Sequence, residues 1–263
     1  VLSGVGHQGW QPVHDFCRTQ RVPCLLPTVA MPPEDEDFYS VYFSRGLVGQ
    51  AHSAADALGQ VPLRPTEVLV LAGATQTEQV QAAAVGHVLT RHHLKVRIAG
   101  EWRADDAVVS ALPASDILAR RVGPAGESPV FALAGMRPVK RDETGSAISS
   151  NATWITDQLH GQAAERQLVR ARAWLRANGL HFSDDVIARN ALMAATVAVE
   201  SLVHVDESFS RDYCIEKLEH NLENMPALTA HPRLSIGPHQ RFAAKTMMLV
   251  PMGDGAAGPV AAR

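Results

Sequence analysis

The chain opens with an apolar strand, a glycine turn, an amphipathic helix and a second apolar strand. This segment reads V-L-S-G-V-G-H-Q-G-W-Q-P-V-H-D-F-C-R-T-Q-R-V-P-C-L-L-P-T. We expect strands at 1–5 and 22–26 with a helix at 9–20 between them. A βαβ unit of this kind predicts a parallel α/β sheet, and the ligands of such sheets lie beyond the carboxyl ends of the strands. The early start of the unit suggests that the chain begins inside a domain.

The composition argues against nucleic-acid binding and against a membrane-spanning segment. The 263 residues are 46% hydrophobic and 19% charged, with a formal net charge of -3. The basic residues are scattered, so no electrostatic footprint for nucleic acid is present. The most apolar stretch, Ala191–Val205, contains Glu200 and His204. It therefore predicts a buried helix, and we expect no membrane-spanning segment.

The rest of the chain continues the α/β pattern and then becomes helical. After an alternating segment at 38–43, we expect helices at 46–59, 77–92 and near 104–111, and strands at 67–72, 95–99, 130–134 and 152–155. Helices follow at 163–178, 183–205 and 210–225, and a last strand at 246–252. A closing strand so far from the other strands fits two sheets that share one chain better than one continuous sheet.

The first turn, Gly4-Val5-Gly6-His7-Gln8-Gly9, matches the pattern G-x-G-x-x-G of dinucleotide-binding folds. That use requires an acidic residue at the end of the next strand to hold the ribose hydroxyls. Here the next strand ends L-L-P-T, and Glu34 and Asp35 lie beyond prolines. We therefore expect no nucleotide cofactor, and a turn whose backbone N–H groups face an anionic or polar ligand.

Motifs of metal and nucleophilic chemistry do not occur. The twelve histidines lack ligand spacing, and neither H-E-x-x-H, C-x-x-C nor G-x-S-x-G is found. We expect no metal, no catalytic residue and no enzymatic activity. Cys17 and Cys24 lie close enough to pair across a turn, and either a disulfide or two buried thiols fits them. Cys214 fits a helix core.

A second loop, Thr75-Gln76-Thr77, also follows a strand and opens a helix. We expect Thr77 to be the N-cap of this helix, with Glu78 in the first turn. The two strand–turn–helix segments are expected to face each other across a cleft, with Thr75 and Thr77 turned toward the His7–Gln8 turn.

Three further segments are distinctive, namely F-Y-S-V-Y-F-S-R-G at 38–46, R-D-Y-C-I-E-K-L-E-H at 211–220 and H-P-R-L-S-I-G-P-H-Q-R-F-A-A-K at 231–245. In these segments the chain resembles the type I periplasmic binding proteins, in particular the branched-chain amino acid and amide receptors of ABC importers. The last segment is similar to a subgroup motif that usually reads Y-P-R-L-S-L-G-P-G-Q-R-F-A-S-K-G, with His239 and Thr246 in place of glycines.

The resemblance implies an α/β fold of two doubly wound, Rossmann-like lobes with interleaved chain crossovers. The first lobe would comprise 1–44 and 156–238 and lack its opening strands. The second would comprise 45–155 and 239–252, and 253–263 would form a flexible tail. The positions that match the family's ligand-binding sites are His7, Gln8, Thr28, Val29, Ala30, Thr75, Gln76 and Thr77. Ala30 departs from the hydroxyl or acid common there, and the aromatic residue of the second-lobe loop is not evident.

The function that the resemblance implies is solute binding. A small polar ligand such as an amino acid, amide or urea would be held between the lobes in the periplasm and delivered to an ABC transporter permease. The alternative is a ligand-sensing regulatory domain of the same fold.

Overall fold

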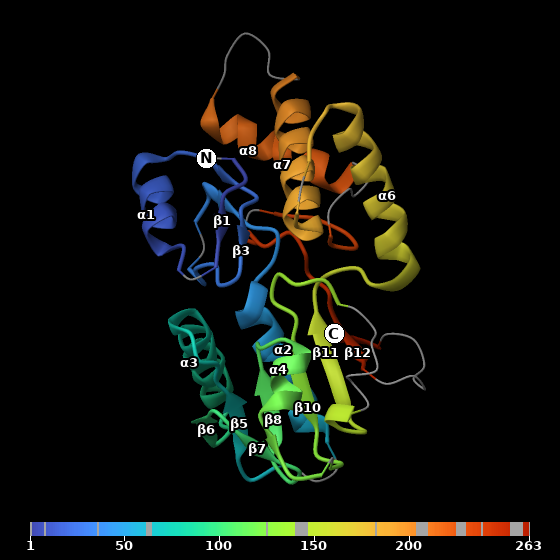
Figure 1. The fold of residues 1–263 in the computed structure, drawn as a ribbon. Helices are drawn as coiled ribbons and strands as arrows, with labels where there is room; N and C mark the ends of the chain where they lie inside the picture. The colour runs from blue at the N-terminus through green and yellow to red at the C-terminus, as the bar shows by residue number, and fades with distance from the viewer. Residues whose placement is uncertain are drawn as a thin grey trace. The chain divides into compact units, whose positions relative to one another are not determined.

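The computed structural model describes residues 2–7, 9–35, 37–61, 65–124, 126–139, 147–181, 183–203, 210–224, 230–237, 239–252 and 260–262. The chain divides into two compact units (Figure 1). Unit 1 comprises Val1–Arg45 and Asp157–Lys245, and unit 2 comprises Gly46–Thr156 and Thr246–Arg263. The chain therefore passes between the units three times.

Unit 2 is built on a seven-stranded sheet with the order β13-β12-β11-β10-β8-β5-β6. Its strands are β5 (Val68–Leu71), β6 (Val96–Ala99), β8 (Ala107–Ser110), β10 (Val130–Leu133), β11 (Ala152–Thr156), β12 (Met247–Pro251) and β13 (Val260–Ala262). The first five run parallel, whereas β12 pairs antiparallel with both β11 and β13. All residues of β5, β8 and β10 are buried, as expected for central strands of a sheet covered on both faces.

Helices cover both faces of this sheet. Figure 1 shows α4 (Ala114–Ala119) in front of the strands and α2 (Gly46–Gln60) behind them. The third helix, α3 (Gln76–Arg91), packs on α2, β5 and β6. A short parallel pair, β7 (Trp102–Arg103) and β9 (Arg121–Val122), adds Trp102 to the core. The Trp102 indole is 1% exposed and donates to the Ile117 carbonyl over 2.8 Å.

Unit 1 contains short parallel strand pairs. β1 (Val5–Gly6) pairs with β3 (Thr28–Val29), and β2 (Cys24–Leu25) pairs with β4 (Ser40–Val41). β2 and β3 are consecutive along the chain. The strand is interrupted between them at Leu26, whose φ is 50°. The bridge between Leu2 and Leu25 has the same register as the pairing of β1 with β3. The strands 1–5 and 22–26 expected from the sequence are thus shorter and broken by this kink.

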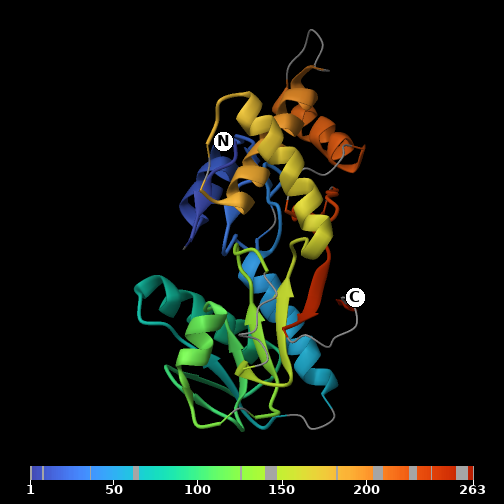
Figure 2. The ribbon, with the colours of Figure 1, turned by 45° about the vertical axis from the view of Figure 1, so that its right-hand side comes forward.

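Four helices accompany these strands, namely α1 (Gln11–Gln20), α6 (Gly161–Ala177), α7 (Asp185–Val203) and α8 (Arg211–Asn224). α7 packs against α6 and α8, and Figure 2 shows α6 alongside it. Leu26, Val41, Met193, Val197 and Leu218 belong to the core between strands and helices.

α7 is the one helix in the described part of the chain whose length and hydropathy would allow it to cross a membrane. Half of the tested stretch is buried inside the structure. Met193, Ala194 and Val197 are completely buried in the core of unit 1. One face of α7 is therefore part of the core, whereas Val199, Leu202 and Val203 are exposed.

The structure corrects three expectations. The helix expected near 104–111 is the strand β8, because V-V-S continues a buried β-branched run. Residues 239–245, assigned to the second lobe, belong to unit 1, where Tyr42 N donates to Arg241 O over 2.8 Å. Residues 260–262, expected in a flexible tail, form β13, while 253–259 lie outside the described residues.

Candidate functional site

The carboxyl edge of the unit 1 strands brings two predicted segments together. Because Val5 pairs with Thr28 and Gly6 with Val29, the turn after β1 lies beside residues 28–30. The Ala30 amide donates to the Gly6 carbonyl over 2.9 Å. Thr28, Val29 and Ala30 are buried, whereas His7 is exposed. Gln8 lies outside the described residues.

Trp10 explains the glycines of the first turn. A Cβ atom on Gly4 would lie 2.4 Å from Trp10 Cη2, and one on Gly6 would lie 2.7 Å from Trp10 Cε3. The indole in turn packs against the buried side chains of Val29, Tyr42 and Phe242. Gly4 and Gly6 thus leave room for the Trp10 ring to pack on β1. This packing is sufficient to explain the two glycines, and a bound dinucleotide is not needed for the explanation.

Thr28 is fixed by a residue that the sequence analysis missed. Asn190, buried on α7, donates from Nδ2 to Thr28 Oγ1 over 3.3 Å. Its Oδ1 accepts from the Ala230 amide, also over 3.3 Å. An amide within the mostly apolar sequence V-I-A-R-N-A-L-M indicates a buried polar side chain, but it does not indicate the partner.

A polar chain runs from the buried Tyr42 and His14 to the exposed Asp35 and Arg18. The Tyr42 hydroxyl and His14 Nδ1 are hydrogen-bonded over 2.8 Å, and both side chains are almost completely buried. His14 Nε2 lies 3.3 Å from Asp35 Oδ2, which also accepts from Arg18 over 2.8 Å. Burial raises the pKa of the Tyr42 phenol far above its usual range, so the hydroxyl keeps its proton.

The corresponding turn of unit 2 is closed by its own residues. Thr75, not Thr77, is the N-cap of α3, and its hydroxyl accepts from the Glu78 amide over 3.2 Å. The Glu78 carboxylate accepts from the Thr75 amide over 2.9 Å, which completes a capping box. This backbone hydrogen bond lowers the pKa of Glu78. Thr77 is the second residue of the helix because the chain becomes helical already at Gln76.

Neighbouring loops at this edge are held by buried polar groups. Gln50, completely buried on α2, accepts from the Gly135 amide over 2.8 Å and so fixes the loop after β10. Arg137 then reaches across the strand ends and donates to the carbonyls of Ala111 (2.6 Å) and Leu133 (3.1 Å). Burial lowers the pKa of this guanidinium, which remains a cation at neutral pH.

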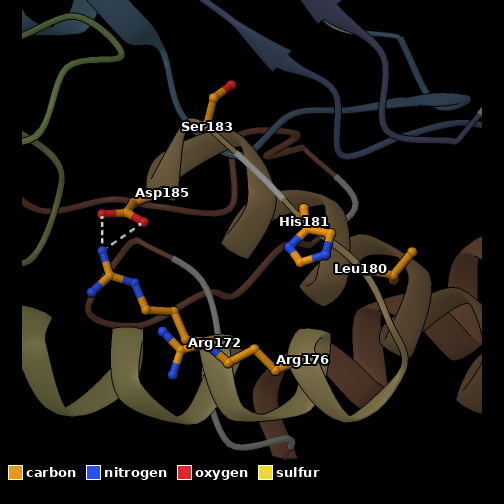
Figure 3. Close-up of a pocket in the computed structure, with 6 residues that line it drawn as sticks. All are labelled: Arg172, Arg176, Leu180, His181, Ser183 and Asp185. Atoms are coloured by element: carbon orange, nitrogen blue, oxygen red, sulfur yellow. Dashed lines mark hydrogen bonds and ion pairs between the residues drawn. The ribbon is translucent and has the colours of Figure 1, made fainter.

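A cavity of about 350 Å³ lies in unit 1, between the end of α6 and the start of α7 (Figure 3). It is lined by Arg172, Arg176, Leu180, His181, Ser183 and Asp185. Arg172 is engaged with both carboxylate oxygens of Asp185, at 3.1 and 2.9 Å. Among the described residues, no group of three or more His, Cys, Asp or Glu side chains is arranged to hold a metal ion.

Solved structures share this architecture at low sequence identity. A branched-chain amino acid ABC transporter protein from Thermus thermophilus with bound valine is 12% identical, with a TM-score of 0.57; the match covers 95% of this chain and 74% of that one. A substrate-binding periplasmic protein from Ralstonia solanacearum is 13% identical, with a TM-score of 0.58. This match covers 90% of this chain and 72% of that one.

A leucine-binding protein from Thermotoga maritima is 12% identical, with a TM-score of 0.55 and coverage of 95% and 76%. This chain has the fold of the type I periplasmic binding proteins. The two-lobed α/β fold expected from the sequence is thus confirmed. No protein-family model and no curated protein matches the chain.

The expected site residues lie at or after strands. Thr28 and Val29 form β3 and Ala30 follows it, whereas Thr75, Gln76 and Thr77 come after β5 in unit 2. Sequence reasoning missed Asn190, Gln50 and Arg137, which support these loops from other elements.

Proposed function

We propose that the protein is a non-enzymatic solute-binding protein that captures a small polar ligand and delivers it to an ABC transporter permease in the periplasm. The ligand contacts the carboxyl edges of both units, and the closed form is favoured because only that form makes both sets of contacts. The fold supports this function, as do the bound valine of the Thermus structure and the names of the other two proteins.

The ligand is proposed to carry a carboxylate or another polar acceptor, which binds to unit 1. The observation that carries this assignment is a difference between two helix starts. α1 begins at Trp10 without a side-chain cap and has no acidic residue in its first turn. α3 begins with a capping box in which Glu78 already supplies a carboxylate. An anionic group is attracted to the first helix start, whereas Glu78 repels it from the second.

Within unit 1, the proposed ligand residues are His7, Gln8, Thr28, Val29 and Ala30. Thr28 has a hydroxyl whose position is fixed by Asn190, and the backbone at Val29 and Ala30 is held by the pairing with β1. In unit 2, Thr75, Gln76 and Thr77 are proposed to contact the polar end of the ligand. Gln76 is exposed at the first position of α3 and offers both an amide donor and an acceptor.

A thermal-shift screen tests the function. Amino acids, amides and urea are added to the purified protein, because a ligand that binds only the native state raises the melting temperature. We expect a subset of these compounds to raise it in a saturable way, with affinities then measured by calorimetry. Absence of a shift with every compound would contradict binding of these ligand classes.

A pair of matched variants tests the assignment to unit 1. Gln11→Glu places a carboxylate in the first turn of α1, where it repels an anionic ligand group, and we expect affinity to fall about fivefold. Gln79→Glu adds the same charge to the start of α3 and should leave affinity unchanged. Equal affinities of the two variants would show that the ligand does not bind at the start of α1.

A further inference from the structure

Two cysteines of unit 1 meet at a reversal of the chain. Cys17 lies in the second half of α1, which ends at Gln20, and Cys24 begins β2. Arg21 adopts a left-handed φ of 51°, and the Val22 amide donates back to the Cys17 carbonyl over 2.9 Å. This reversal returns the chain along the end of the helix, so that residues seven positions apart lie side by side.

The two thiols are neighbours within the core. Cys17 and Cys24 are both 0% exposed, and Cys17 lies near enough to Cys24 to help raise the pKa of its thiol. Cys24 is also held through its backbone, since its amide donates to the Tyr39 carbonyl over 2.7 Å. The pair is therefore positioned by the helix end on one side and by the strand on the other.

We propose that Cys17 and Cys24 form a disulfide that joins the end of α1 to β2. All three cysteines are free thiols in the structure, and Cys214, which lies on α8, keeps its thiol in this proposal. This inference goes beyond the proposed function, although a periplasmic location would supply the oxidising surroundings in which disulfides persist.

The cross-link forms by exchange with an external disulfide. The thiolate of one cysteine attacks a sulfur of that disulfide, which gives a mixed disulfide and releases one thiolate. The second cysteine then attacks the mixed disulfide, forms the Cys17–Cys24 bond and releases the second thiolate. The external disulfide is reduced by two electrons, and the two protons lost by the cysteines end on its two thiols.

The exchange takes place while the chain folds. Burial raises the pKa of Cys24 to about 12, and the neighbouring Cys17 adds to this shift, while the Trp10 side chain opposes it. Cys24 in the folded, reduced protein thus holds almost no thiolate at neutral pH, and neither cysteine side chain is accessible to a second molecule. Once made, the bond is protected by the same burial.

Refolding of the full chain with oxidised glutathione tests the proposal. We expect intact mass to fall by two hydrogen masses and the thiol count to fall from three to one. Trypsin cuts after Arg18 and Arg21, between the two cysteines, so the unreduced digest should contain a peptide ending at Arg18 linked to 22–45. Reduction should separate the two. Addition of the oxidant to reduced protein that is already folded should give the link far more slowly.

Stability gives a second readout. The closed loop is short, so the oxidised form should melt about 5 to 10 °C above the reduced form. Cys214→Ser should retain the link and this difference, whereas Cys17→Ser should lose both.

Three remaining thiols after oxidative refolding, or a link that includes Cys214, would overturn the proposal. The mass of the unaltered chain shows whether the disulfide forms. The proposal can therefore be tested even if one of the variants fails to fold. Ligand binding is measured separately, so failure of the proposed function would not affect these results.

Discussion

Asn190 donates a hydrogen bond to Thr28 although the two residues are 162 positions apart. The contact joins the start of β3 to the first half of α7, and the same side-chain amide accepts from the Ala230 backbone. One buried side chain thus connects three segments of unit 1. Its conformation sets where the Thr28 hydroxyl lies at the proposed ligand edge.

Replacement of Asn190 should therefore affect stability and binding together. Asn190→Ala leaves the buried Ala230 amide without its acceptor, and we expect the free energy of unfolding to fall by about 1 to 3 kcal/mol. Ligand affinity should fall as well, because Thr28 is no longer positioned. Chemical denaturation and calorimetry measure the two effects. Asn224→Ala, at the exposed end of α8, is the control; an equal loss there would contradict the assigned role.

The contact of Trp10 with the first turn makes Gly6 irreplaceable. Gly6→Ala would place a methyl group 2.7 Å from an indole that is itself packed against Val29 and Phe242. We expect a loss of about 1 to 3 kcal/mol from overpacking. Gly9→Ala is the matched variant, because nothing lies within 4 Å of its Cβ, and it should change stability by less than about 0.5 kcal/mol. Urea denaturation of both variants checks this, and equal losses would refute it.

The capping box of α3 should make stability depend on pH. The pKa of Glu78 is lowered in the folded state, so its contribution is present above the usual carboxyl pKa and lost as the pH falls through the lowered value. Glu78→Gln should therefore be less stable than the unaltered protein at neutral pH, and this difference should vanish in acid. Thermal unfolding across this pH range measures it. Glu101→Gln, at an exposed position, should show no such dependence.

Gln50 should be needed for the loop that leads to Arg137. Gln50→Leu keeps the buried volume but leaves the Gly135 amide without its acceptor, and we expect stability to fall by about 1 to 3 kcal/mol. Gln60→Leu, at the exposed end of the same helix, should have little effect. Hydrogen exchange of the Gly135 amide gives a local readout. Unchanged protection in Gln50→Leu would show that the amide is held by other groups.

Sequence periodicity predicted most elements, because their signals are local. β5 and α3 follow from E-V-L-V-L-A and from the helical spacing after Thr75. β8 was mistaken for a helix because its central position in the sheet, which decides its conformation, is a tertiary property. The N-cap was placed at Thr77 because either threonine satisfies the pattern, and only the Glu78 contact selects Thr75.

The candidate site was predicted only where it follows strand ends. Thr28 and Thr75 could be named because, within each sheet, the carboxyl ends of parallel strands lie at the same edge. Asn190 and Gln50 could not, since their partners lie far away along the chain and no local rule specifies them. The role of Trp10 was hidden for the same reason: the pattern of glycines is visible, but the ring that requires them is not.

The strand β12 has a consequence for how unit 2 folds. Its partner β11 is separated from Met247–Pro251 by the whole of 157–245, so their pairing closes a long loop of chain. Until this pairing forms, β11 has no neighbour on one side, and Trp154 and Ile155 lie along an open strand edge. Pairing of this edge with another chain therefore competes with folding until β12 arrives.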